Sequence, residues 1–228
     1  MTKIFVPTTS PQDWKSLLAD PEKQWHTGYS AYAIAHAWEA AKGNFPPEVE
    51  HVFADAEDER LRNLKILLAF PEWKVYLPPR GHPSQNDLFI LAKGEQGLVS
   101  IMVEGKVAEP FGETKERWLT PATPGKLKRL EFIQSKLGLG GELPQTIRYQ
   151  LLHRTISAVS EAERFGAKSA VMLVHSFSQD HLWFKDYQAF LELFGVHSAR
   201  PGELYLLTEL QGIALFAGWA TGDPKFLG

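Results

Sequence analysis

The 228-residue sequence predicts a single α/β domain with a central mixed β-sheet flanked by helices, over residues 1–228. Three observations predict this fold. Residues 87–93 and 97–107 are apolar at nearly every position, which is typical of strands covered on both faces. Segments with helical periodicity lie before and after them. No internal repeat or clear linker divides the chain, so we expect one core.

Helices dominate the first third of the sequence. Ser10 and Pro11 are typical of a helix start, and this short helix is predicted to run through Leu18. Residues 29–43 predict a stronger helix that ends at Gly43, and the proline pair at 46–47 begins another. Residues 61–70 have helical character but are ambiguous, and residues 73–78 predict a short strand.

The second half alternates helices and strands. A basic amphipathic helix is predicted over 123–138 and the longest helix over 143–166, each followed by glycine. Residues 169–177 predict a buried strand, and residues 180–195 an aromatic-rich helix. Residues 203–210 and 212–222 predict two final strands.

Composition excludes several classes of protein. There is no cysteine, which excludes disulfides and Cys-ligated metal sites and fits a cytoplasmic protein. We expect no signal peptide, because residues 1–15 have no long apolar core after Lys3. We also expect no membrane span, because no apolar run reaches about 18 residues. The net charge is −3, yet residues 115–154 hold eight bases and three acids. Such a basic segment marks either an anionic partner or solvated helix surfaces.

The hairpin of residues 87–107 carries polar residues at its open end. If Gly94–Gly97 forms the turn, paired residues have numbers that sum to 191, and Asp87 lies opposite Glu104. Opposed residues have Cβ atoms about 4.5–5.5 Å apart. Because side chains alternate along a strand, Lys106 shares a face with Glu104. The sequence therefore predicts that two carboxylates and an amine meet.

Two interpretations of this meeting remain open. Lys106 can neutralise one carboxylate in a structural ion network, although buried networks are a poor source of stability. Alternatively, the carboxylates hold Mg²⁺, which prefers few carboxylates together with waters and phosphate oxygens. The lysine would then orient a water or stabilise charge on a phosphate.

Asp87 followed by Glu104-Gly105-Lys106 on the next strand resembles the signature of the PD-(D/E)XK nuclease superfamily, which includes restriction and repair endonucleases. The resemblance covers residues 29–177, with a helix, a strand meander, a long helix and a buried strand in order. It implies a restriction endonuclease-like core with helical N-terminal and helix-plus-hairpin C-terminal additions. It also implies that Asp87 and Glu104 bind Mg²⁺, or Mn²⁺ as a substitute, and that Lys106 assists the attacking water. Pro83 stands four residues before Asp87, which departs from a strict Pro-Asp pair.

The same resemblance suggests further site residues. Members often carry an acid on the helix before the sheet, for which Glu39 is the candidate metal ligand, with Glu48 and Glu50 behind it. They also carry a polar residue on the helix after the lysine, for which Gln150 is the candidate catalytic residue. The basic residues expected along a nucleic-acid backbone are Lys126, Lys128, Arg129, Arg148 and Arg154.

The resulting expectation is a Mg²⁺-dependent phosphodiesterase that acts on DNA. An enzyme that cuts both strands needs two active sites, which a homodimer would supply. The alternatives are a nuclease-like module that binds nucleic acid or protein without cutting it, and an unrelated α/β domain in which the three residues form an ion network.

Overall fold

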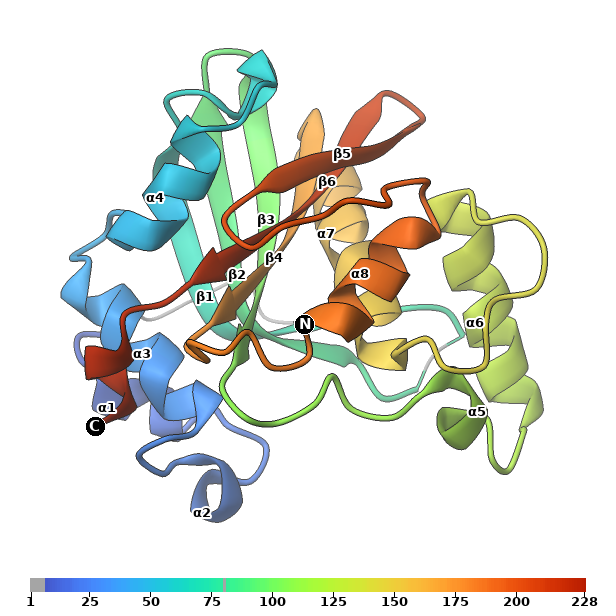
Figure 1. The fold of residues 1–228 in the computed structure, drawn as a ribbon, viewed down its shortest axis with the longest axis horizontal. Helices are drawn as coiled ribbons and strands as arrows, with labels where there is room; N and C mark the ends of the chain where they lie inside the picture. The colour runs from blue at the N-terminus through green and yellow to red at the C-terminus, as the bar shows by residue number, and fades with distance from the viewer. Residues whose placement is uncertain (1–6, 80) are drawn as a thin grey trace.

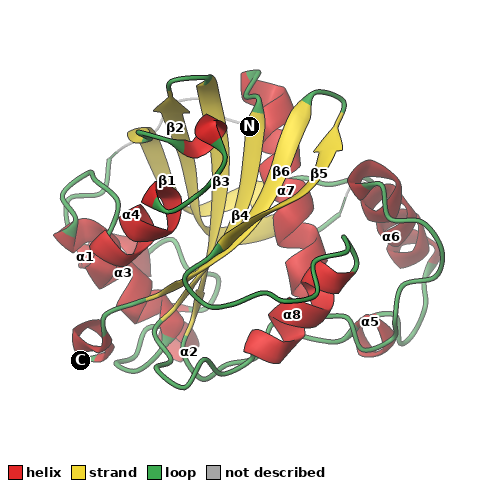
Figure 2. Ribbon diagram, turned by 45° about the horizontal axis from the view of Figure 1, so that its top comes forward, coloured by secondary structure: helices red, strands yellow, loops and turns green. Residues whose placement is uncertain are grey.

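A six-stranded mixed sheet forms the centre of the protein (Figures 1 and 2). The computed structural model describes residues 7–79 and 81–228, so residues 1–6 of the segment expected to carry no signal peptide lie outside the described part. The sheet order is β1-β2-β3-β4-β6-β5. The strands are β1 (Lys65–Val75), β2 (Ser84–Gly94), β3 (Gly97–Lys106), β4 (Ser169–Ser176), β5 (Leu204–Leu210) and β6 (Ile213–Thr221).

Helices cover both faces of the sheet, as Figure 1 shows. The first group lies on one face and comprises α1 (Pro11–Lys15), α2 (Pro21–Gln24), α3 (Ser30–Ala40) and α4 (Pro47–Ala54). The second group comprises α5 (Lys115–Trp118), α6 (Pro124–Leu137), α7 (Tyr149–Phe165) and α8 (Phe184–Glu192). Short 3₁₀ helices, η1 (Glu59–Leu61) and η2 (Pro224–Leu227), complete the structure. Two apolar cores result, one on each side of the sheet, which confirms the predicted α/β domain.

Strand directions explain why the sheet is mixed. The first three strands form an antiparallel meander. The long α7 then crosses over, so that β4 returns parallel to β3. β6 is parallel to β4, and β5 pairs with β6 in the antiparallel sense at the edge.

The register of the β2–β3 hairpin matches the sequence prediction. Gly94 pairs with Gly97 and Leu88 with Val103, so every pair sums to 191. Continuing this register by one step places Asp87 beside Glu104. Side chains alternate between faces, and the even positions of β3 around Met102 face α7. Glu104 and Lys106 therefore face α7 as well.

The ambiguous segment at 61–70 is largely a strand. β1 runs through Lys65–Val75, joining most of this segment to the strand predicted from residue 73. Its helical character was misleading because β1 is an edge strand, exposed or only half-buried along most of its length and interrupted by a bulge near Leu67. A bulge shifts the alternation of apolar residues, which is the main sequence signal of a strand.

α1 and α3 end slightly earlier than predicted, at Lys15 and Ala40, and two further helices are much shorter than predicted. α7 begins at Tyr149 rather than near 143, because the backbone N–H groups of Lys115 and Glu116 donate to residues 147 and 145 and hold this part as an extended loop. It ends at Gly166, which has the left-handed φ of 68° that favours glycine. α8 is confined to Phe184–Glu192 and begins after Trp183, whose φ is also left-handed.

Candidate active site

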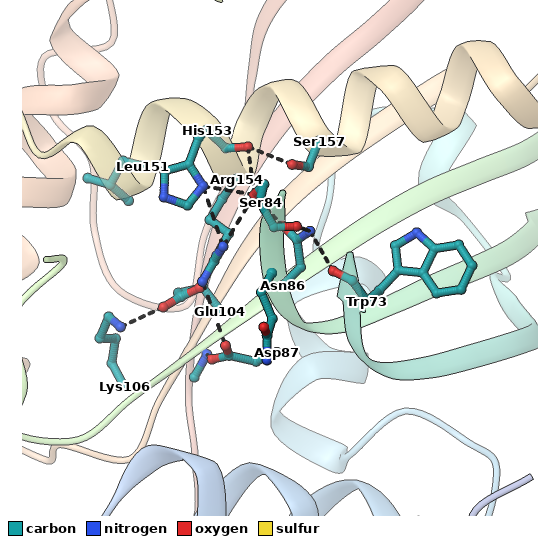
Figure 3. Close-up of polar contacts among 12 residues, drawn as sticks. Trp73, Ser84, Asn86, Asp87, Glu104, Lys106, Leu151, His153, Arg154 and Ser157 are labelled. Atoms are coloured by element: carbon teal, nitrogen blue, oxygen red, sulfur yellow. Dashed lines mark hydrogen bonds and ion pairs between the residues drawn. The ribbon is translucent and has the colours of Figure 1, made fainter. Parts of the chain in front are cut away.

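Asp87, Glu104 and Lys106 come together under α7, at the end of the β2–β3 hairpin that is remote from its turn (Figure 3). Glu104 and Lys106 are almost fully buried, with side chains 2% and 4% exposed. Asp87 is more accessible, at 20%. The predicted convergence of these three residues is therefore confirmed by the structure.

Glu104 is held by two cations, one on each carboxylate oxygen. Nζ of Lys106 donates to Oε1 over 2.6 Å, and Nε of Arg154, on α7, donates to Oε2. Burial alone would raise the pKa of Glu104, but Arg154 and Lys106 outweigh it and lower the pKa. Glu104 is therefore an ionised carboxylate that accepts one hydrogen bond from the sheet, from Lys106, and one from α7, from Arg154.

Asp87 is less completely paired. Its Oδ2 accepts from the backbone N–H of Gly105 over 2.8 Å, and its Oδ1 lies 3.8 Å from Nη2 of Arg154. A Cβ atom at position 105 would lie 3.3 Å from Oδ2 of Asp87 and 3.4 Å from Cβ of Ile34. The glycine between the two motif residues thus leaves room for the aspartate to accept its N–H.

A third carboxylate, Glu72 of β1, joins the row. Pro71 pairs with Leu88 and Trp73 with Asn86, so Glu72 lies next to Asp87 on the neighbouring strand. Its Oε2 accepts from the side-chain amide of Gln85 over 2.6 Å. Its φ is 52°, an uncommon value for a residue with a side chain. We define the charge cluster as Glu72, Asp87, Glu104, Lys106 and Arg154.

Three carboxylates and two cations leave the charge cluster one positive charge short. Burial, followed by the charge of Glu104, raises the pKa of Asp87 to about 7. Burial, followed by the charge of Asp87, raises the pKa of Glu72 to about 8. The carboxylates of the charge cluster therefore hold a proton near neutral pH, or accept an added cation in place of that proton.

Glu39, the predicted additional metal ligand, lies elsewhere. Its Oε1 accepts from the hydroxyl of Thr8 over 2.8 Å and from the indole N–H of Trp14 over 2.7 Å. It sits on α3, in the layer opposite α7, and ties the N-terminal segment to that helix. Glu48 is occupied too, since its Oε1 bonds Nε2 of His175 over 2.8 Å.

Gln150, the predicted catalytic residue, shares α7 with Arg154 but forms no hydrogen bond with the charge cluster in the part of the chain that the structure describes. Its Oε1 is buried and accepts no hydrogen bond from a described residue. Its Cβ borders Gly112, in the loop after β3. Gln150 and Arg154 are four positions apart on α7, yet of these two only Arg154 hydrogen-bonds a carboxylate of the charge cluster within the described chain.

Most of the predicted nucleic-acid contacts are used within the protein. Arg154 belongs to the charge cluster, and Arg148 donates to Asp186 and to the carbonyl of Gly112. Arg129 donates to the carbonyls of Leu77, Pro79 and His82. Lys126 and Lys128, near the start of α6, have no carboxylate partner among the described residues. These two lysines remain for an external anion.

A comparison with protein families matches residues 7–224 to a domain of unknown function, DUF6946. The chain belongs to the DUF6946 family. No curated protein and no solved structure matches it. Within the residues described for this DUF6946 domain, no group of three or more histidines, aspartates or glutamates could hold a metal ion, and no helix is long and apolar enough to cross a membrane.

Sequence reasoning missed the roles of two members of the charge cluster in this DUF6946 domain. Arg154 follows Leu151 by three positions and precedes Ala158 by four, so it lies in the buried stripe of α7. That periodicity could have identified it as buried. Glu72 carried no comparable signal. Its position beside Asp87 depends on the register between β1 and β2, and the connection between these strands has no recognisable turn.

Proposed function

We propose that this DUF6946 domain is a Mg²⁺-dependent phosphodiesterase that hydrolyses the DNA backbone. The observation that carries the proposal is the meeting of Asp87, Glu104 and Lys106 on one face of adjacent strands. The order of elements supports it: helix α3, the meander β1–β3, helix α7 and the parallel strand β4 follow the order expected of a PD-(D/E)XK core.

The donor set fits a weakly caged divalent ion. Mg²⁺ commonly takes one or two carboxylates and completes its shell with water and substrate phosphate. Asp87 and Glu104 would hold it, and Oδ1 of Asp87 accepts no hydrogen bond from a described residue. A bound Mg²⁺ ion would supply Lewis-acid activation of the phosphodiester. The missing positive charge of the cluster supports this assignment.

Protein groups would do the rest of the chemistry. Lys106 donates one hydrogen bond to Glu104 and has two further N–H donors, so it can stabilise negative charge that develops on a phosphate oxygen. Its charge also faces the ring of Phe111 at 5.2 Å, which limits the positions of the amine. Because Lys106 and Glu104 are buried, substrate must open a path to them.

A second candidate is a nuclease-like module that binds nucleic acid or protein without cutting it. Arg154 favours this alternative, because its guanidinium donates to Glu104 and lies 3.8 Å from Asp87, where a metal ion would be bound. In that case the charge cluster is a structural ion network. The guanidinium of Arg154 would then permanently supply the positive charge that a metal ion would supply in the enzyme.

Cleavage assays separate the two candidates. Plasmid, linear and single-stranded DNA are incubated with the protein in Mg²⁺, Mn²⁺ or EDTA. We expect metal-dependent cleavage that Glu104→Gln and Lys106→Met each reduce by at least about 100-fold, as for loss of a charge-stabilising group. Glu50→Gln, an exposed glutamate on α4, is the control and should retain full activity. No cleavage by the folded protein with any DNA or metal would exclude the enzyme.

Calorimetry with Mn²⁺ tests the metal site without turnover. The wild type should bind Mn²⁺, and Asp87→Asn should weaken binding about tenfold or more while the protein stays folded, since it removes one carboxylate ligand. Equal binding by both proteins would leave the ion network as the explanation of the cluster.

A further inference from the structure

A pocket of about 400 Å³ lies beside the charge cluster, on the outer side of α7. Residues 79 and 81–84 form one wall, Trp118 and the first turns of α6 form the other, and Tyr149 and His153 complete the lining. We call it the α6–α7 pocket. Its volume lies within the range of small-molecule sites, about 300–1,000 Å³.

The pocket combines an aromatic surface with unpaired positive charge. Trp118 and Tyr149 stack with ring centroids 3.6 Å apart and an interplanar angle of 11°. Nζ of Lys126 lies 5.8 Å from the Trp118 ring centroid, and among the described residues it donates only to the backbone carbonyl of Pro121. None of the described residues that line the pocket is acidic. A ligand with a flat ring and a negative group matches these walls.

Arg129 fixes the shape of this site. Its guanidinium donates to the carbonyls of Leu77, Pro79 and His82, which belong to the loop that forms the opposite wall. It pairs with no carboxylate among the described residues, so its charge adds to that of Lys126. The loop and α6 are thus held at a fixed separation by a residue that also makes the pocket positive.

His153 offers a donor to this pocket. Its Nδ1 lies 2.8 Å from the Ser84 hydroxyl and 3.4 Å from Nη1 of Arg154, which can only donate. Nδ1 is therefore an acceptor, and in the neutral ring the proton sits on Nε2. Burial and the neighbouring cations, Arg154 first, lower the pKa of His153 and keep it neutral. Its Nε2–H donates to no residue in the described chain.

A short chain of contacts joins the pocket to the charge cluster (Figure 3). Ser84 and His153 line the pocket, and both contact Arg154. Arg154 in turn donates to Glu104, which accepts from Lys106. A single arginine thus separates the pocket lining from Glu104, one of the proposed metal ligands.

We propose that the α6–α7 pocket binds one nucleotide unit, with its base against Trp118 and Tyr149 and its phosphate beside Lys126 and His153. This rests on the proposed function, in which the same nucleotide belongs to the nucleic acid being cut. Base–aromatic stacking tolerates any base, while a phosphate requires the cation. Only an unpaired nucleotide can present its base to such a pocket, so the site selects single strands or frayed ends over intact duplex.

Binding is measured in EDTA, so that cleavage cannot occur. Calorimetry compares thymidine monophosphate with thymidine and with inorganic phosphate, and polarisation compares a labelled single strand with the same sequence as duplex. We expect the monophosphate to bind at least about tenfold more tightly than either fragment, because stacking and charge pairing act together. We also expect the single strand to bind more tightly than the duplex.

Lys126→Gln should weaken binding of the monophosphate about tenfold, since it removes a charged contact to the phosphate. Lys136→Gln is the matched control, because Lys136 lies on the same helix, pairs with Glu163 at the surface and does not line the pocket. Trp118→Leu should weaken both the monophosphate and thymidine. Thermal unfolding verifies that each variant is folded.

The proposal is overturned if the monophosphate binds no more tightly than phosphate, or if both lysine variants lose affinity equally. Its failure is distinct from failure of the nuclease. Binding without cleavage supports the pocket and the non-cutting module, whereas cleavage without monophosphate binding supports the enzyme alone. If the free monophosphate binds and the single strand does not, the ligand is a free nucleotide rather than part of a chain.

Discussion

Nη2 of Arg154 lies 3.8 Å from Oδ1 of Asp87, while Nε of the same guanidinium donates to Glu104. One arginine therefore bridges the two carboxylates that we propose as metal ligands. The Arg154 side chain is only 8% exposed, so water has little access to solvate the two carboxylates in its place. This bridge makes the cluster testable through the arginine as well as through the acids.

Arg154→Met should destabilise the protein by about 3–5 kcal/mol, because it leaves a buried carboxylate with one partner fewer. If the carboxylates can bind a divalent ion, Mn²⁺ should recover a large part of that loss by filling the vacated position. Denaturant unfolding with and without Mn²⁺ measures both effects.

Lys136→Met is the control for the arginine variant. Lys136 pairs with Glu163 over 2.7 Å at the surface, where both side chains are more than one-third exposed. Its loss should cost about 0–1 kcal/mol, with no dependence on Mn²⁺. If Mn²⁺ stabilises the two variants equally, the charge cluster does not accept a metal in place of the guanidinium.

Gly105→Ala should destabilise the protein by about 1–2 kcal/mol, because the added methyl crowds Asp87 and Ile34 at 3.3 and 3.4 Å. Gly140→Ala is the matched change, since a Cβ there meets nothing within 4 Å. We expect that variant to be neutral or slightly stabilised. Urea unfolding compares them, and equal stability would show that Gly105 is not required by packing.

We expect the protein to lose stability as pH rises toward 8, because of Asp87 and Glu72 in the charge cluster. Asp87 and Glu72 have folded pKa values of about 7 and about 8, above their unfolded values, so the native state binds more protons between about pH 4 and pH 8. Stability from these groups is complete below the unfolded pKa and is lost through the folded pKa. Asp87→Asn or Glu72→Gln should flatten this slope.

The size of this effect is on the order of 1–3 kcal/mol for each group. The free energy of unfolding is measured from pH 5 to pH 8 for the wild type and both variants. Glu104 acts in the opposite sense, because its lowered pKa gives stability that is lost only at acid pH. A wild-type profile that rises steadily across this window would contradict the assignment of a shared proton.

Glu48→Gln should destabilise the protein by about 1–2 kcal/mol, because it removes the charged partner of the buried His175. Burial opposes ionisation of Glu48, but the hydrogen bond with His175 and the backbone hydrogen bonds together outweigh it and lower the pKa of Glu48. Glu50→Gln, an exposed change on the same helix, should have no measurable effect. Thermal unfolding of the two variants at pH 7 checks the difference.

Much of the site was predictable from local sequence. The Gly94–Gly97 turn fixed the register of β2 and β3, and alternation then placed Glu104 and Lys106 on one face. These relations depend on a few adjacent residues, and a tight turn transmits them without any knowledge of the rest of the fold. The order of helices and strands followed from periodicity and caps for the same reason.

The partners of those residues were decided only by the tertiary structure. Arg154 reaches Glu104 because α7 packs on the sheet with this side of the helix facing β3. Glu72 lies beside Asp87 because of the register in which β1 pairs with β2. Both depend on contacts between distant segments, which carry little local signal. The sequence alone determined which carboxylates and which amine would meet. Packing decided that an arginine would stand between the carboxylates and that a third acid would share their charge.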